Sequence, residues 1–297
     1  MSLVVGLARD GRGTSALHLA AVLARSRSDR LVVCAVVSER WPAGIARIDA
    51  EYQDYVENAA GDALDLARLA LPSDIEASFE LVRAHSTPAG LLTAADQHGA
   101  NMLVIGSTSS GAHGQVSLGS VAERLLHSAP VPVAMAPRGF RARPTATVHR
   151  VTAAYGATGG SDEVVGAAAE LAVDCDATLR VASFAVRPPS MLTAGVGSRA
   201  DDAVLTEWGG YVEAQQAELL TKLGSGHAVR GSTESAIGYG RDWRDAIDHI
   251  GWTEGDLLLV GSSSVGPLAR VFLGSRASKI VRNSPLPVVV LPRTGQQ

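Results

Sequence analysis

The sequence repeats itself, and this repetition constrains the fold more than any other feature. Three blocks recur in the same order and at one constant separation: an apolar run that ends in Gly-Ser, a Leu-Gly-Ser triplet and a Pro-rich segment. They lie at 102–107 and 257–262, at 118–120 and 273–275, and at 130–133 and 285–288. Because chance does not preserve the register of three blocks, the chain is interpreted as a tandem duplication in which both copies adopt one fold.

The length is consistent with two domains. A chain of 297 residues suits two units of about 150 residues, and a unit of that size buries enough surface to hold its own core. Segment 138–149 contains three Arg, one Gly and one Pro and has no apolar period, which is typical of a linker. We therefore predict one domain at 1–139 and a second at 149–297.

The composition argues against several functional classes. Hydrophobic residues make up 46% of the chain and charged residues 19%, as in ordinary globular proteins. A net charge of −4 gives no electrostatic reason to expect nucleic acid or a membrane surface as a partner, and no apolar run is long enough to span a bilayer. Two cysteines are too few for a disulfide scaffold or a zinc cluster, and no signal-peptide pattern is visible. We expect a cytoplasmic protein.

Short apolar runs alternate with helical periods in both copies. In the first copy the expected strands are 3–7, 31–37, 75–82, 102–105 and 131–135. Their Val, Ile and Leu content without strict polar alternation is typical of strands buried on both faces. Alternation with helices indicates right-handed β-α-β units. The fold class is therefore α/β, with an open five-stranded parallel sheet and helices on both faces in each half.

Two long helices are expected to pack through an apolar stripe. The stripe of the first comprises Tyr52, Val56, Ala59, Ala63, Ala67 and Leu71, and that of the second comprises Val204, Trp208, Tyr211, Val212, Leu219 and Leu223.

The loop after the fourth strand is the expected ligand site in each half. Ligands of open α/β sheets bind at the carboxyl ends of the strands, and segments 106–120 and 261–275 are Gly/Ser-rich loops that open a helix there. Unpaired backbone N–H groups and the helix dipole favour an anion such as phosphate. The alternative is that Ser120 and Glu123 form a capping box that satisfies these amides.

This pattern resembles the universal stress protein family, in a form with two domains in one chain. The resemblance is strongest over 102–137 and 257–292. It implies a Rossmann-like fold of the adenine nucleotide alpha hydrolase type in each half. Many members of the family bind ATP through a Gly-x-x-Gly–nine residues–Gly-Ser/Thr loop, whereas others lack the loop and bind none.

The resemblance implies a set of nucleotide-binding residues on the loop, at the start of the following helix and at the end of the second strand. In the first half these are Gly106, Ser109, Gly119, Ser120, Val121 and Val36, and in the second half Gly261, Ser264, Gly274, Ser275 and Arg276. The expected ligand is ATP or another adenine nucleotide, with Mg²⁺ as the companion ion of ATP, and no cofactor is expected if the loops are degenerate.

Both halves depart from the family pattern at two places. Ser109 and Ser264 replace the second glycine of the loop, and Ala8 and Tyr155 stand where the family usually has Asp, with Asp10 close to that position. If the second glycine needs a left-handed backbone, serine there is strained by roughly 1–2 kcal/mol, which weakens binding about tenfold. Gly111 or Gly114 is then expected to take over part of the turn.

The sequence offers little support for catalysis. Ala112 and Pro267 stand where a P-loop requires Lys, so at most slow ATP hydrolysis is expected. His113 either touches a phosphate or is an exposed loop residue. We expect a stress-response regulatory module, and the alternative is a nucleotide-free interaction protein.

The last strand of each half begins at a proline, Pro132 or Pro287, which places it at a sheet edge. Universal stress proteins commonly dimerise through that strand. The resemblance therefore implies that 131–135 and 288–291 pair inside one chain as a pseudo-dimer, with homodimerisation of whole chains as a further alternative.

Overall fold

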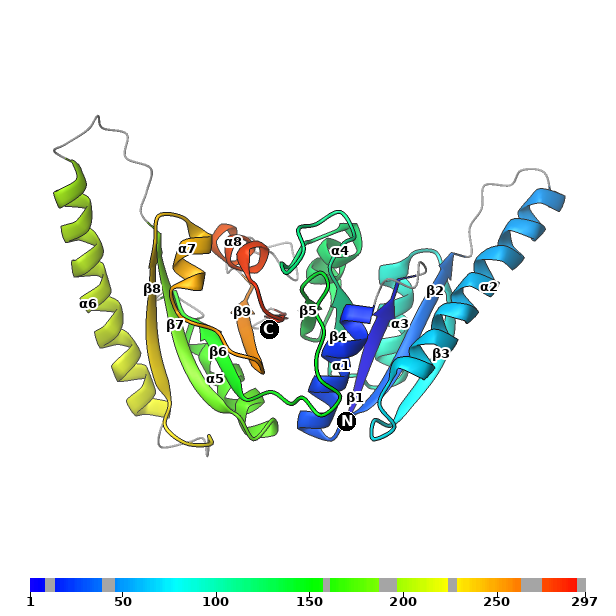
Figure 1. The fold of residues 1–297 in the computed structure, drawn as a ribbon, viewed down its shortest axis with the longest axis horizontal. Helices are drawn as coiled ribbons and strands as arrows, with labels where there is room; N and C mark the ends of the chain where they lie inside the picture. The colour runs from blue at the N-terminus through cyan, green and yellow to red at the C-terminus, as the bar shows by residue number, and fades with distance from the viewer. Residues whose placement is uncertain are drawn as a thin grey trace.

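The computed structural model describes residues 1–8, 14–38, 46–156, 161–186, 197–223, 229–262 and 274–292, and these residues form one continuous twisted sheet with helices on both faces (Figure 1). The strand order is β3-β2-β1-β4-β5-β10-β9-β6-β7-β8. Every neighbouring pair of strands is parallel except β5 and β10. The α/β prediction is therefore confirmed.

The first half comprises β1 Ser2–Leu7, α1 Thr14–Arg27, β2 Arg30–Ser38, α2 Ala46–Ala70, β3 Ala77–Ala84, α3 Thr87–Gln97, β4 Met102–Gly106, α4 Ser120–Ser128 and β5 Val133–Ala136. The second half comprises β6 Arg150–Ala154, α5 Ser161–Asp174, β7 Thr178–Val186, α6 Gly197–Leu223, β8 Glu234–Gly240, α7 Trp243–Asp248, β9 Asp256–Gly261, α8 Ser275–Asn283 and β10 Val288–Leu291.

The predicted strands differ from the observed ones mainly at their starts. β3 begins at Ala77 rather than at residue 75, because the amide of Ile75 closes a turn onto the carbonyl of Pro72 at 3.2 Å. β5 begins at Val133 rather than at residue 131. The preceding Pro132 has no N–H to donate and joins the ladder only through its carbonyl, which accepts from the β4 strand at 2.9 Å.

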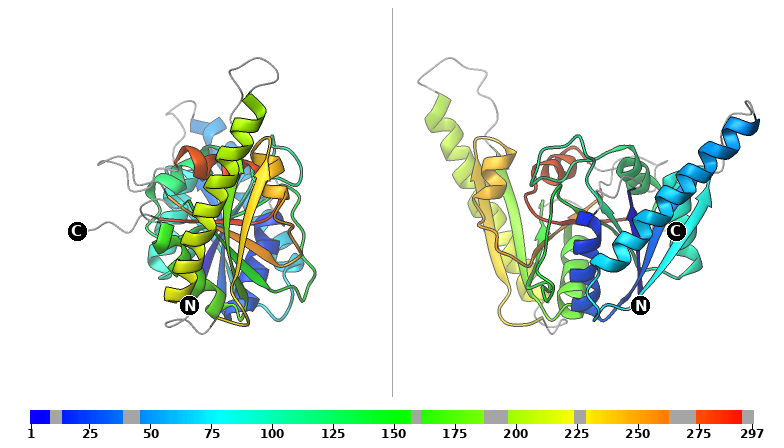
Figure 2. Two further views of the ribbon diagram at one scale, coloured as in Figure 1. Left: turned by 90° about the vertical axis from the view of Figure 1, so that its left-hand side faces the viewer. Right: turned by 45° about the vertical axis from the view of Figure 1, so that its right-hand side comes forward.

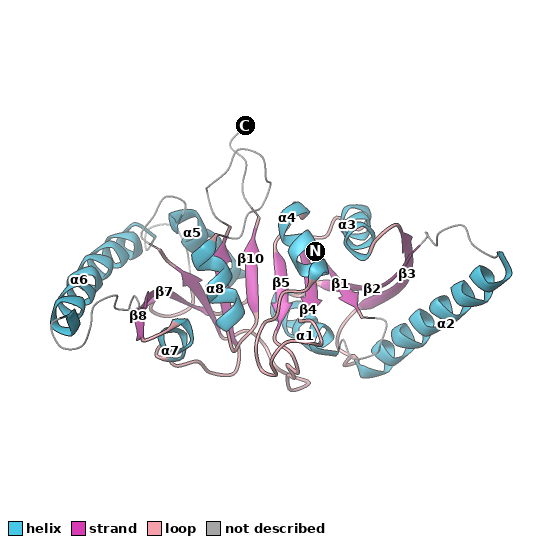
Figure 3. Cartoon of the chain, turned by 90° about the horizontal axis from the view of Figure 1, so that it is seen from above, coloured by secondary structure: helices cyan, strands magenta, loops and turns pink. Residues whose placement is uncertain are grey.

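Two apolar cores lie on the two faces of the sheet. Helices α1, α2, α5 and α6 cover one face, and α3, α4, α7 and α8 cover the other. The view from above separates the helices of the first half, α1 to α4, from those of the second (Figure 3). Both cores contain residues of both halves, so the halves share their hydrophobic interior.

The predicted apolar faces of the two long helices are correct at their central residues and wrong at two tyrosines. On α2 and α6 the buried members include Ala63, Ala67, Val212 and Leu219. Tyr52 and Tyr211 are 45% and 57% exposed, so they do not belong to the packed faces. Both long helices lie at the outer ends of the molecule (Figure 2), where a helix packs on the sheet along one side only.

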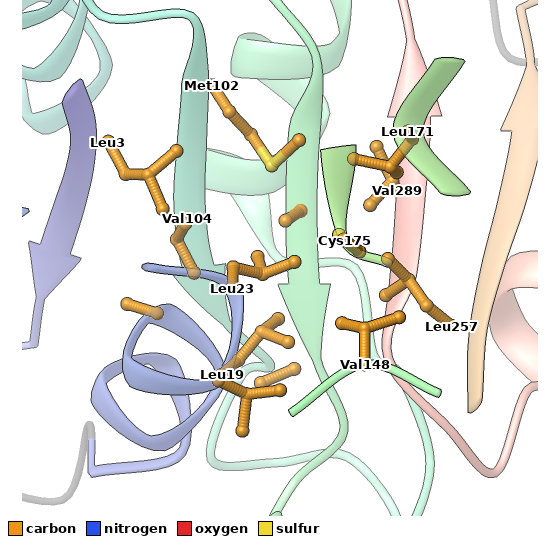
Figure 4. Packing of buried hydrophobic residues seen from close by; sticks show 14 of the residues in the cluster. Leu3, Leu19, Leu23, Met102, Val104, Val148, Leu171, Cys175, Leu257 and Val289 are labelled. Atoms are coloured by element: carbon orange, nitrogen blue, oxygen red, sulfur yellow. The ribbon is translucent and has the colours of Figure 1, made fainter. Parts of the chain in front are cut away.

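The last strands of the two halves pair inside the chain. β10 runs antiparallel to β5, with Val289 opposite Ala134. Around this junction Leu19, Leu23, Leu171 and Val289 come together from α1, α5 and β10 (Figure 4). The predicted intrachain pseudo-dimer is therefore present, whereas homodimerisation of whole chains stays untested.

The described helices give no indication of membrane insertion: none of them combines the length and the apolar character that a bilayer span requires.

Candidate functional site

Ser107 joins the two arms of the loop that follows β4. Its hydroxyl donates to the carbonyl of Ala136 at 2.7 Å and accepts from the amide of Ser117 at 3.0 Å. The amide of Thr108 then donates to the carbonyl of Ser117 at 3.2 Å. One hydroxyl thus fixes the loop between β4 and the start of α4, a role that the sequence pattern did not single out.

Glycines allow the loop to fold tightly. Gly114 has a φ of +75°, which favours glycine, whereas no positive φ is found at Ser109. The strain expected for serine at position 109 is therefore absent, and the left-handed residue is Gly114, one of the two alternatives expected. A Cβ on Gly119 would lie 3.2 Å from Thr108 Cβ, so the loop approaches the helix start closely.

The first turn of α4 has no side-chain cap among the described residues. Gly119 is the N-cap, with extended backbone, and its carbonyl accepts from the amide of Glu123 at 2.9 Å. Ser120 is the exposed first residue of the helix rather than its cap, and the Glu123 carboxylate lies 3.3 Å from Arg282. The capping-box alternative is therefore wrong, and the amides of the first turn remain available to an external acceptor.

The second half has the same kind of helix start. Gly274 is the N-cap of α8, again without a side-chain cap among the described residues, and Ser275 and Arg276 follow it as exposed residues. Gly261 ends β9, and a Cβ there would collide with Val164 of α5. Ser264 lies outside the described residues.

The predicted loop residues of the first half come together, but Val36 lies apart from them. Gly106, Ser109 and the start of α4 belong to one loop, whereas Val36 is on β2, with β1 between it and β4. The Val36 side chain is 3% exposed and packs beneath α3 at Gly90. In this structure it is part of the core, and its contact with adenine stays a prediction.

The position of the family's aspartate differs between the halves. Asp10 lies outside the described residues. Tyr155 is 7% exposed, and its carbonyl accepts a hydrogen bond from Ser183 Oγ at 2.8 Å. Burial raises the pKa of the Tyr155 phenol, so this side chain stays neutral and cannot replace a carboxylate.

The second half supports the loop of the first half. The amide of Val116 donates to the carbonyl of Ser284 at 3.3 Å. The Gln115 amide, oriented with its oxygen toward α7, accepts two hydrogen bonds from Arg244, at 3.1 and 2.8 Å. With the Arg282–Glu123 ion pair, these contacts place second-half residues on both sides of the candidate site.

Two histidines stand beside groups with which they could act: His113 lies in the Gly/Ser-rich loop, and His85 is followed by the hydroxyl residue Ser86. His113 is exposed and its ring lies against Gly139. Ser86, next to His85, caps α3 by accepting from the amide of Ala89 at 3.4 Å, which is a structural role. Among the described residues, no cluster of three or more His, Cys, Asp or Glu could hold a metal ion.

The chain contains two α/β units, each built on parallel strands. In both units a helix follows the fourth strand and begins at a glycine N-cap without a side-chain hydrogen bond among the described residues. This arrangement defines a tandem protein of the Rossmann-like class. The model of the universal stress protein family matches residues 1–137 and 147–292. The chain therefore belongs to the universal stress protein family, as a tandem member.

Relatives match the chain along its whole length. Universal stress proteins of Mycobacterium tuberculosis (strain H37Rv) and Mycobacterium bovis are 41% identical to this chain over 296 residues, which cover 98% of the chain and 100% of each relative. Among solved structures, a universal stress protein from Archaeoglobus fulgidus aligns with a TM-score of 0.56 at 17% identity, over 98% of this chain and 97% of its own. A putative universal stress protein from Pseudomonas aeruginosa aligns with a TM-score of 0.57 at 18% identity, over 98% and 93%.

Proposed function

We propose that this protein is a cytoplasmic stress-response regulatory module that binds an adenine nucleotide, with ATP as the first candidate, at the loop after β4 and at its counterpart after β9. The observation that carries the proposal is the uncapped start of α4, behind a loop fixed by Ser107. The family supplies the nucleotide class, because many members bind ATP through this loop.

The phosphates would be held mainly by the backbone. The amides of Ser120 and Val121 lie at the positive end of α4, where an anion gains both hydrogen bonds and a favourable helix dipole. A Cβ at Gly119 would lie 3.2 Å from Thr108 Cβ, so a larger side chain there would crowd the helix start at which we place the phosphate. Arg276 begins α8 with a cation at the corresponding place in the second half.

Binding without efficient turnover is the proposed mode of action. The sequence has Ala112 and Pro267 where a P-loop would place Lys. The loops therefore lack the lysine that, in a P-loop enzyme, stabilises the negative charge of the reacting phosphates. Mg²⁺ would be held by the phosphates of the nucleotide itself. In a regulatory protein of this kind the signal is the bound nucleotide itself and not a reaction product.

Calorimetric titration with ATP tests the proposal. We expect saturable binding to the chain, reduced at least about tenfold in the double variant Gly119→Val/Gly274→Val, because valine fills the space that a phosphate oxygen needs. Gly61→Val/Gly210→Val is the matched control, since a Cβ at either position meets nothing within 4 Å. Equal affinity in both double variants would remove the site assignment. No heat at millimolar ATP, and no nucleotide after acid extraction, would favour the nucleotide-free interaction protein.

A further inference from the structure

The solvent-facing side of α2 carries a regularly spaced row of mostly apolar residues. Its positions are spaced three and four residues apart: five are apolar, Tyr52, Tyr55, the half-buried Ala59, Leu66 and Leu69, and one is acidic, Asp62. Spacing of this kind is the seam of a coiled coil, in which two helices pack along one side. We call these six positions the α2 seam.

The seam is exposed although its large members are apolar. Tyr55, Leu66 and Leu69 are 70%, 59% and 84% exposed. The opposite side of the same helix is packed on the sheet, with Ala60 and Leu64 at 0% and 7%. A single exposed leucine needs no explanation, but a row along one helix face marks an interaction surface.

The second half shows that the fold does not require such a row. α6 occupies the corresponding place at the other end of the molecule (Figure 1). Of its described side chains, residues 206–223, only Tyr211 is a large exposed apolar group. Among the side chains that the structure describes, such a row is therefore present on α2 and not on α6.

The charges beside the seam are acidic. Asp54 is exposed and Asp62 stands within the row, and neither has an ion-pair partner among the described residues. Asp65 also lies beside the seam, and its partner Arg68, at 2.6 Å, is the one cation of the described part of the helix, 51–70. A helix that docks here meets uncompensated negative charge.

This charge selects the occupant. A second copy of the chain would set the same carboxylates against each other, with Asp62 facing Asp62 in a parallel pair and the acidic rows side by side in an antiparallel one. A helix with Leu at its own seam and Lys or Arg beside it would satisfy both the apolar row and Asp62. We propose that the α2 seam binds a basic amphipathic helix of another protein.

A designed helix pair tests the proposal on the whole chain. The probe is a fluorescent peptide of three heptads with Leu at the seam and Lys beside it, and its matched partner carries Glu in place of Lys. Fluorescence anisotropy should show saturable binding of the Lys peptide only. Leu66→Glu/Leu69→Glu should weaken it at least about tenfold, because two apolar contacts are lost.

The control variant is Ala214→Glu/Ala217→Glu, which adds the same charges at the same spacing to exposed positions of α6. It should leave binding of the Lys peptide unchanged, and Asp54→Lys/Asp62→Lys should transfer the preference to the Glu peptide. The seam substitutions replace exposed side chains, and an unchanged melting temperature verifies that the variant is folded.

Three results would overturn the proposal. Equal binding of both peptides would mean apolar adhesion without charge selection. Binding that survives Leu66→Glu/Leu69→Glu would place the contact elsewhere. A dimer of the chain in sedimentation velocity that these substitutions dissociate would identify a second copy as the occupant. None of these outcomes depends on nucleotide binding.

Discussion

At the residue scale, one hydroxyl and a few glycines shape the candidate site. Ser107 holds both arms of the first loop, Gly114 makes its left-handed turn and Gly119 starts α4. The Gly/Ser content predicted the place of this loop. It could not predict which glycine has the positive φ or that Ser120 is the first helical residue and not the N-cap. A shift of the turn or of the helix start by one residue changes both results, and the sequence does not fix these positions that closely.

Replacing Ser107 by Ala tests this local arrangement. The change removes the acceptor of the Ser117 amide and the hydroxyl that reaches Ala136, so we expect the free energy of unfolding to fall by about 1–2 kcal/mol and ATP to bind several-fold more weakly. Chemical denaturation and calorimetry measure the two effects. Ser110→Ala is the control, since Ser110 is exposed and, among the described residues, its hydroxyl forms a hydrogen bond with Thr108 alone, at 3.3 Å. Identical behaviour of the two variants would contradict the role of Ser107.

The two cysteines offer a second test at this scale. Burial raises the pKa of the Cys34 and Cys175 thiols to about 12, so both stay protonated in the native protein. At about pH 8 a thiol reagent should label neither in the folded chain and both after denaturation. Unfolded thiols ionise near their ordinary pKa of 9.0, so this contribution to stability is lost as the pH rises from about 9 toward 12. Rapid native labelling of either thiol would contradict the packing.

At the scale of the elements, the loop of the first half depends on helices of the second. Arg244 of α7, Arg282 of α8 and Ser284 behind it contact the loop or the start of α4. Nothing in the sequence predicted these contacts, because the residues are far apart in the chain and meet only through the β5–β10 pairing. The places of the strands and helices along the chain, by contrast, followed from local apolar periods. The same periods misplaced Tyr52, since a helix at the end of a sheet buries one narrow side only.

Arg244→Ala tests the support of the loop from α7. Loss of its two hydrogen bonds to Gln115 should weaken ATP binding in the first half about fivefold, the equivalent of about 1 kcal/mol. Arg241→Ala is the control, because Arg241 is exposed beside the same helix and forms an ion pair with Asp245, at 2.9 Å, away from the loop. If both variants bind ATP like the parent chain, the loop does not need this contact.

At the scale of the whole molecule, the two halves share their apolar cores, and we therefore expect them to unfold together. Leu23 is fully buried where α1, the linker and α5 meet (Figure 4). The duplicated blocks predicted two similar folds, and the family resemblance supplied their pairing. The apolar cores continue across the β5–β10 junction because residues of both halves pack together there. Neither repeat alone contains this packing.

Leu23→Ala should therefore destabilise the entire chain. The cavity should lower the free energy of unfolding by about 2–5 kcal/mol within a single cooperative transition. Leu69→Ala, which changes a side chain that is 84% exposed, should remain within about 0.5 kcal/mol of the parent. Denaturant unfolding followed by circular dichroism distinguishes the cases, and two separate transitions in the parent chain would contradict the shared core.

Nuclear magnetic resonance of the backbone amides during an ATP titration tests the central claim most directly. Phosphate held at the helix start predicts saturable shifts that are largest for Ser120, Val121 and Ala122, with a parallel response at Ser275. Saturable binding that leaves these amides unmoved and shifts another surface would contradict it.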